Sequence, residues 1–317
     1  MSGATIQTVL GGIAAADLGP CDAHEHLFLR SPVLPGEELV DRDLIAAEAA
    51  LLAAAGAASV VDWTPIGLGR DPVGLQLVAR SSGLHIVAAT GFHRQAHYPD
   101  GHWVRREPVD ELRALVTADL TSGIDVNDWC GPRERPTDVR AGVVKVGTGY
   151  WHASPLERKL IEASASAAVA CGAPVCAHSE HGTFALELVG LLLDNGVAPD
   201  AIVVAHLDRN PDPGLHRAVA EAGVFLQYDG PGRAKYHPDS TILALIEAVA
   251  EAGHGDQLLL GGDTPRRSHL VSAGGGPGMA YPFATFLPRV RRELGDAIAD
   301  RITVANPARA FALRAPR

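Results

Sequence analysis

The feature that most restricts the fold of this 317-residue chain is a repeated alternation of short β-like runs with alanine-rich helical runs. The predicted strands are 20–26, 57–63, 84–91, 139–147, 173–178, 201–206, 223–228 and 257–263. Helix-length runs with apolar residues at helical spacing lie at 41–55, 71–82, 108–121, 155–170, 182–195, 213–222, 240–253 and 283–294. Eight such β–α units predict an α/β fold, a TIM (β/α)8 barrel, formed as a single domain over residues 1–317.

Glycines mark the ends of several helical runs. Those that stand just before a predicted strand, as helix stop signals do, are Gly56, Gly172, Gly196 and Gly223. The competing fold is a doubly wound sheet, which would need a glycine-rich turn after its first strand. HEHLFLR is not such a turn, and GGGPG does not match GxGxxG. The longest irregular stretch, 264–282, follows the last predicted strand and favours a substrate loop over a spacer.

Composition excludes several classes of protein. A formal net charge of −10 without a long acidic block argues against a nucleic-acid partner. The four cysteines form no CxxC pair, which fits a reducing cytoplasm. The N-terminus lacks a basic segment, so we expect no signal peptide, and no apolar run reaches the length of about 18 residues that a spanning helix needs. We therefore expect a cytoplasmic protein whose partner is a small-molecule substrate, with no membrane.

The first predicted strand carries two histidines in CDAHEHLFLR, at residues 21–30. Side chains alternate along a strand, so Asp22, His24 and His26 share one face and Glu25 takes the other. If that face looks into the barrel, both imidazoles converge at its C-terminal mouth, where barrel enzymes keep their chemistry. Taken alone, an HxH pair also fits two structural histidines.

Three other strands end in metal-competent residues, and a fourth carries a lysine. The three strand ends are His178, His206 and Asp263. Lys145 lies between valines, where an unpaired ammonium is costly to bury. Such a lysine either snorkels or pairs with a carboxylate, or it has a lowered pKa and reacts with carbon dioxide. The resulting carbamate is an anionic oxygen ligand able to bridge two cations.

The ordered series of HxH, lysine, two histidines and aspartate resembles the phosphotriesterase family of the amidohydrolase superfamily. The similar segments are TVLG, LGPCDAHEHL, VDWTPIGLGRD, TGFH, VVKVGTGY, AHSEHG, VAHLDRNPD, GGD and NPARAF. The resemblance implies two divalent cations, the more buried one held by His24, His26 and Asp263. It assigns His178 and His206 to the more exposed cation, and carboxylated Lys145 together with a hydroxide as the bridge. It also suggests a homodimer.

The resemblance implies a catalytic role for Lys145 and Asp263. The bridging hydroxide attacks a carbonyl or phosphoryl centre, and Asp263, with its second oxygen free, moves the proton to the leaving group. Imidazole and carboxylate ligands suit zinc, with manganese, cobalt or iron as alternatives. His181, one helical turn beyond His178, is expected to support that ligand.

The loops after the seventh and eighth strands carry several cations. Arg233 and Lys235 lie in the first loop, and Arg266 and His269 in the second. They form either an anion pocket or solvated loop charges. Their segments resemble the family branch that opens phosphorylated sugar lactones, which grips the phosphate with a lysine, an arginine and a tyrosine. Lys235 and Arg266 match the first two, but His269 replaces the tyrosine, so a carboxylated or unphosphorylated lactone stays open.

These observations predict a binuclear metal-dependent lactonase. Hydrolysis of a phosphotriester, a carboxylic ester or an amide on the same site is the enzymatic alternative. A metal-loaded binding protein without activity is the alternative outside the enzymes, and it would lack a ligand or an open coordination position. Among weaker candidates, His93 and His97 could line the cleft, and Asp62 with Arg70 could form a buried pair at the barrel mouth.

Overall fold

The computed structural model describes residues 3–130 and 136–315. Its eight-stranded sheet is parallel and follows chain order. The strands are β3 (Cys21–Glu25), β4 (Ser59–Asp62), β5 (His85–Gly91), β6 (Val143–Thr148), β7 (Val175–Ser179), β8 (Ile202–Ala205), β9 (Phe225–Tyr228) and β10 (Leu258–Leu260). The first and last strands meet where the amides of Gly262 and Asp263 donate to the His24 carbonyl, at 3.1 and 2.7 Å. The predicted TIM barrel is confirmed.

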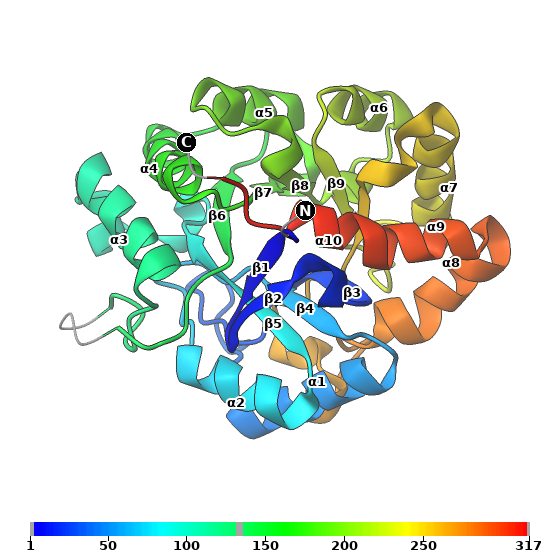
Figure 1. Cartoon of the computed structure of the whole chain (residues 1–317), viewed down its shortest axis with the longest axis horizontal. Helices are drawn as coiled ribbons and strands as arrows, with labels where there is room; N and C mark the ends of the chain where they lie inside the picture. The colour runs from blue at the N-terminus through cyan, green and yellow to red at the C-terminus, as the bar shows by residue number, and fades with distance from the viewer. Residues whose placement is uncertain (1–2, 131–135, 316–317) are drawn as a thin grey trace.

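Helices surround this barrel on all sides (Figure 1). They are α1 (Arg42–Ala54), α2 (Pro72–Ser82), α3 (Val109–Thr121), α4 (Pro155–Cys171), α5 (Ala185–Asp194), α6 (Pro213–Glu221), α7 (Asp239–Val249), α8 (Leu287–Leu294), α9 (Asp296–Asp300) and α10 (Asn306–Ala310). The eight predicted helices are confirmed, and the fourth predicted strand, 139–147, begins only at Val143. In the described part of the chain, none of the helices combines the length and apolarity that crossing a membrane requires.

Local sequence explains where α4 begins and ends. Ser154 accepts a hydrogen bond from the Glu157 amide, and the Glu157 carboxylate accepts one from the Ser154 amide, which forms a capping box. Pro155 occupies the first helical position, where its missing N–H costs nothing. At the other end Gly172 has a left-handed φ of 69°, and a side chain there would collide with the Arg314 carbonyl. The glycine stop signal is thus confirmed for this helix.

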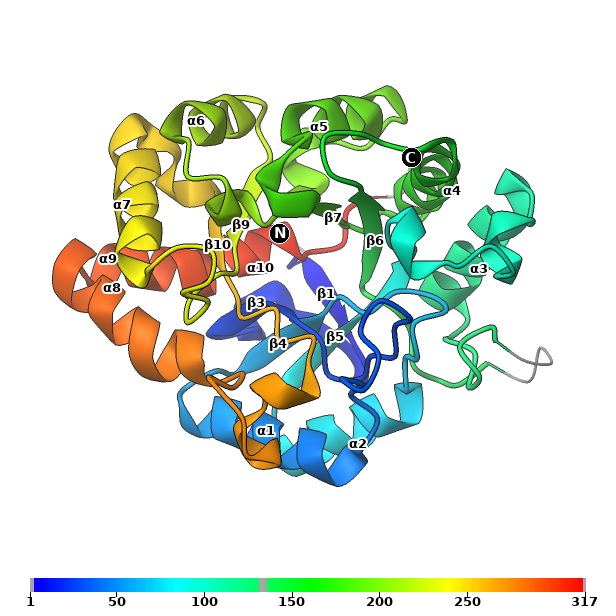
Figure 2. The same ribbon diagram turned by 180° about the vertical axis from the view of Figure 1, so that it is seen from behind.

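An N-terminal hairpin that the sequence did not predict covers one end of the barrel. It pairs β1 (Thr5–Thr8) with β2 (Gly11–Ala14) and is visible at the centre of Figure 1. The Leu313 amide donates to the Thr5 carbonyl at 2.8 Å, so the C-terminal segment lies against the hairpin. Ile6 is fully buried among the side chains inside the barrel. The strands' carboxyl ends open on the opposite side, seen in Figure 2.

A buried network of ion pairs joins Arg70, which precedes α2, to two aspartates in and after α3. Arg70 donates from Nη1 to Asp119 at 2.7 Å and from Nε to Asp128 at 2.6 Å. Asp62 instead accepts from the Thr64 amide at 2.9 Å. The expected pair of Asp62 with Arg70 is therefore wrong, because the guanidinium reaches α3 and the loop beyond it.

We expect Arg70→Met to lower the free energy of unfolding by about 3–5 kcal/mol, because it leaves two buried carboxylates without their cation. Urea denaturation followed by circular dichroism measures the change. The matched control is Arg289→Met, which removes an exposed pair with Glu293 on α8 and should leave the midpoint unchanged. Equal midpoints for Arg70→Met and the parent protein would contradict the role of this network.

Candidate metal centre

The six predicted metal residues converge at the C-terminal end of the barrel, and all are buried. They are His24, His26, Lys145, His178, His206 and Asp263. The Nε2 atoms of His24 and His26 lie 3.7 and 3.5 Å from Asp263 Oδ1. His178 Nδ1 and His206 Nε2 lie 2.7 Å apart. The side chains thus form a trio and a pair of facing ligand atoms.

Two of these residues have an unusual backbone conformation. His206 and Asp263 have φ values of 65° and 48°, in the left-handed region that residues other than glycine seldom adopt. Both follow the end of a strand, β8 and β10 respectively. Such conformations cost about 1–3 kcal/mol each and persist mostly at functional sites. The fold therefore accepts strain where these two side chains turn into the site.

Neighbouring oxygens fix the orientation of three imidazoles. Thr64 Oγ1 contacts His26 Nδ1 at 2.9 Å, and the Asp229 oxygens contact Nδ1 of His24 and of His206, at 3.1 and 2.7 Å. Occupied Nδ1 atoms leave Nε2 as the free ligand atom. Burial acts to raise the pKa of Asp229, but His206 and Arg209 hold it well below its ordinary value. This carboxylate directly follows β9, and the sequence analysis did not include it among the candidate site residues.

The fourth imidazole is oriented by a carboxylate that the prediction overlooked. His178 Nε2 lies 2.7 Å from Glu180, which also pairs with Arg94 at 3.1 Å, so Nδ1 of His178 remains for the site. His181 was expected in this role, and that expectation is wrong. Its backbone is left-handed, with φ 55°, and its half-exposed ring lies 3.7 Å from Glu180 Oε1 and edge to face with Tyr150, rather than against His178. The chain does not continue helically from His178, so the assumed spacing does not apply.

Lys145 has the environment that a carbamate-forming lysine needs. Its side chain is fully buried, and Nζ has no hydrogen-bond partner among the described residues. Nζ lies 4.3 Å from the centre of the Trp63 ring, which in turn stacks on His24 at 3.9 Å. Burial lowers the pKa of Lys145 to about 8, so the reactive neutral amine is populated near neutral pH. Among the residues that the structure describes, none of the carboxylates forms an ion pair with Lys145, and its full burial excludes snorkelling.

The two oxygens of Asp263 face different partners. Oδ1 faces His24 and His26, as described, whereas Oδ2 accepts from Arg209 Nη2 at 2.5 Å and lies 3.4 Å from Arg233 Nη1. The expectation of a free second oxygen is therefore wrong. Burial opposes ionisation, but Arg233 and His24 hold the pKa of Asp263 well below its ordinary value. Asp263 is an ionised carboxylate, as a metal ligand should be.

The donor set fits divalent metal ions. Buried ligand atoms without a hydrogen-bond partner include His24 Nε2 as well as Lys145 Nζ. Burial lowers the pKa of His24 to about 4 and that of His206 to about 3, so both imidazoles are neutral at pH 7. Within the described ranges of the chain, two groups could hold an ion: His24, His26 and Asp263, or His24, His206 and Asp229. We favour the first, because the oxygens of Asp229 already contact imidazole Nδ1 atoms and Arg209.

A cavity of about 250 Å³ lies over this centre. The cations on its wall are Arg94, Arg209, Arg233, Lys235 and Arg266. Arg233 is only 8% exposed and is held by Asp263, whereas Arg266 lies 3.8 Å from Glu37 and is about one-third exposed. His269 does not line the cavity. Burial lowers its pKa, and so do the nearby charges of Arg233, Lys235 and Arg266.

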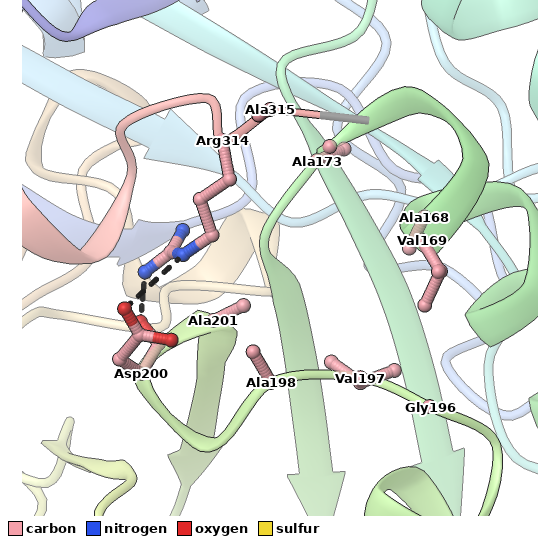
Figure 3. Close-up of a pocket in the computed structure, with 11 residues that line it drawn as sticks. Ala168, Val169, Ala173, Gly196, Val197, Ala198, Asp200, Ala201, Arg314 and Ala315 are labelled. Carbon is pink, nitrogen blue, oxygen red and sulfur yellow. Dashed lines mark hydrogen bonds and ion pairs between the residues drawn. The ribbon is translucent and has the colours of Figure 1, made fainter. Parts of the chain in front are cut away.

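A different hollow lies at the other end of the barrel (Figure 3). It has a volume of about 190 Å³ and small apolar lining residues, including Ala168, Val197 and Ala201. Arg314, which also lines this hollow, forms an ion pair with Asp200. None of the predicted site residues lines it, so the chemistry belongs to the cavity over the imidazoles.

Comparisons with known proteins agree with this geometry. Residues 4–311 match the model of the phosphotriesterase family. A phospho-furanose lactonase of Mycoplasmopsis synoviae is 32% identical, over 96% of this chain and 91% of that protein. The crystal structure of an amidohydrolase from Mycoplasma synoviae covers all of this chain and 94% of its own, with 30% identity and a TM-score of 0.96. A lactonase structure from Listeria monocytogenes has 29% identity and a TM-score of 0.89, and covers 98% of this chain and 100% of its own. The chain therefore belongs to the phosphotriesterase family and is a hydrolase of ester or lactone bonds.

Proposed function

We propose that this chain opens the lactone of a phosphorylated sugar acid with two divalent cations, most suitably zinc. The observation that carries the proposal is the convergence of six buried ligand residues, including an amine without a partner, beneath a cavity with cations on its wall. The relative named phospho-furanose lactonase supports the substrate class. The homodimer stays a prediction from the family resemblance.

Each residue has a definite task in this proposal. His24, His26 and Asp263 would hold one cation and His178 with His206 the other, with carboxylated Lys145 between them. Bound there, the cations would lower the pKa of a water molecule and polarise the lactone carbonyl. Thr64, Asp229 and Glu180 keep the imidazole tautomers fixed, so that the ligand nitrogens need no rearrangement.

Asp263 is the proposed proton carrier. Its carboxylate takes the proton of the attacking water and gives it to the departing alkoxide oxygen of the lactone. Arg209 and Arg233 keep this carboxylate a weak base, because they stabilise its ionised form at Oδ2. A proton received there is therefore released readily to the far more basic alkoxide.

The cavity wall favours an anionic substrate over a neutral organophosphate. Lys235 and Arg266 project positive charge toward it, in a protein whose formal net charge is −10. A phosphate group pairs well with such cations. An organophosphate would call for a largely apolar pocket, whereas charged side chains and imidazoles outnumber the apolar lining residues here, which are Leu29, Val33, Leu34, Tyr236 and Pro265. Turnover of a lactone or of an organophosphate would distinguish the corresponding hydrolase from a metal-loaded binding protein without activity.

We expect Arg266→Ala to raise KM for a phosphorylated lactone about tenfold to a hundredfold, because a charge-assisted contact is worth about 1.5–3 kcal/mol. KM for the dephosphorylated lactone should change little. Steady-state kinetics on the matched pair of substrates gives both values. The control is Arg267→Ala, which removes an exposed neighbouring cation outside the cavity lining. Equal effects of Arg266→Ala on both substrates would remove phosphate from the proposal.

A further inference from the structure

Two buried histidines near the cavity have no task in the proposed metal centre. His93 follows β5 by two residues, and His97 lies in the next turn. Each is 7% exposed, and both line the cavity. The ring of His93 meets the ring of His178 edge to face, with 4.6 Å between centres. His93 thus stands beside a ligand assigned to the more exposed cation.

The ring of His93 is held on several sides. The Arg94 amide donates to its Nδ1 at 2.8 Å, and its own amide donates to Tyr98 Oη at 2.9 Å. Its face stacks on His97 at 3.9 Å with an angle of 10° between the planes. His97 is itself held through Nδ1 by Ser31 Oγ at 2.8 Å. The ring has little freedom to rotate away from the cavity.

This arrangement determines which nitrogen of His93 carries the proton. A backbone N–H can only donate, so Nδ1 must present its lone pair, and a neutral imidazole then carries its proton on Nε2. Among the described residues, the hydrogen bond to the His93 ring is made at Nδ1, and none is made at Nε2. The protein therefore fixes a donor at the cavity wall and leaves that donor unused.

We propose that Nε2–H of His93 donates a hydrogen bond to a sugar-ring or hydroxyl oxygen of the lactone, which makes His93 a specificity-determining residue. The inference rests on the proposed lactonase function. A fixed donor left unpaired is costly, so a site of this kind disfavours ligands that offer no acceptor oxygen there. The donor also lies on the wall next to His178, apart from the loop cations that would hold a phosphate.

The test compares His93→Phe, which keeps the stacked ring but removes both nitrogens, with His93→Gln, which keeps an N–H close to the position of Nε2. We expect His93→Phe to lower kcat/KM for the lactone about tenfold, the value of one hydrogen bond of about 1.4 kcal/mol. His93→Gln should recover most of that loss. Both variants should bind as much metal as the parent protein. The control, His254→Phe, changes a histidine that does not line the cavity and should leave kcat/KM nearly unchanged.

Heteronuclear NMR of the imidazole nitrogens supplies a readout that does not depend on turnover. We expect Nε2 of His93 to resonate as a protonated nitrogen and Nδ1 as an unprotonated one. The opposite tautomer, an unchanged kcat/KM in His93→Phe, or an equal loss in His254→Phe would overturn the inference and leave the lactonase standing. A parent protein that opens no lactone would overturn both.

Discussion

Asp263→Asn should lower kcat by about a thousandfold or more while the protein keeps much of its metal, because general acid–base groups contribute about 10²–10⁴-fold. Asparagine retains an oxygen that can face His24 and His26, but it cannot accept the proton that the proposed reaction releases. Arg209 and Arg233 would also lose the carboxylate that they contact now. Lactone turnover and metal analysis by plasma mass spectrometry measure the two quantities separately.

Asp22→Asn is the matched control for that variant. Asp22 is also buried near the barrel mouth, and its Oδ1 accepts from the amides of His24 and Gly262. Burial raises its pKa to about 8, so this side chain is largely protonated at pH 7 and an amide should replace it with little effect on kcat. A parental rate in Asp263→Asn would show that another group carries the proton.

Lys145→Ala should abolish turnover and most of the metal, because it removes the proposed bridge between the two cations. A short carboxylate such as propionate can place two oxygens in the vacated space, and we expect it to restore part of both properties. Propylamine, which resembles the unmodified lysine side chain, should restore neither. This comparison separates loss of the carbamate from general damage to the barrel.

Two outcomes of the Lys145→Ala experiment would contradict the proposed role of the carbamate. If Lys145→Ala retains two equivalents of metal and the parental rate, the bridging role is wrong. If propylamine restores activity as well as propionate does, the lysine acts as an amine. The position of Nζ, fully buried over the Trp63 ring and without a partner among the described residues, is the reason that we expect the carbamate.

The convergence of the candidate ligands could be predicted from the sequence because a barrel converts strand position into spatial position. His178, His206 and Asp263 each stand at or just beyond the end of a strand, and parallel strands end on the same side. Asp229 also follows a strand, but its role depends on reaching His24, from which 205 residues separate it. No local pattern in the sequence contains that contact.

Other features depend on backbone geometry that a sequence pattern does not reveal. The left-handed turn at His181 gives the task of supporting His178 to Glu180. The N-terminal hairpin that covers one end of the barrel is built of four-residue strands, which are too short to show a periodic pattern of apolar residues. The loop cations were predicted as a group, but no local pattern indicates that Arg233 faces Asp263. Position along a barrel is encoded locally, whereas pairing between loops is not.

A crystal structure with anomalous diffraction, from protein grown with zinc and bicarbonate, tests the central claim most directly. We predict one metal peak among His24, His26 and Asp263 and a second beside His178 and His206, with density for a carboxyl group joined to Nζ of Lys145. A bare lysine side chain still lying over Trp63, with fewer than two metal peaks at these imidazoles, would contradict the account.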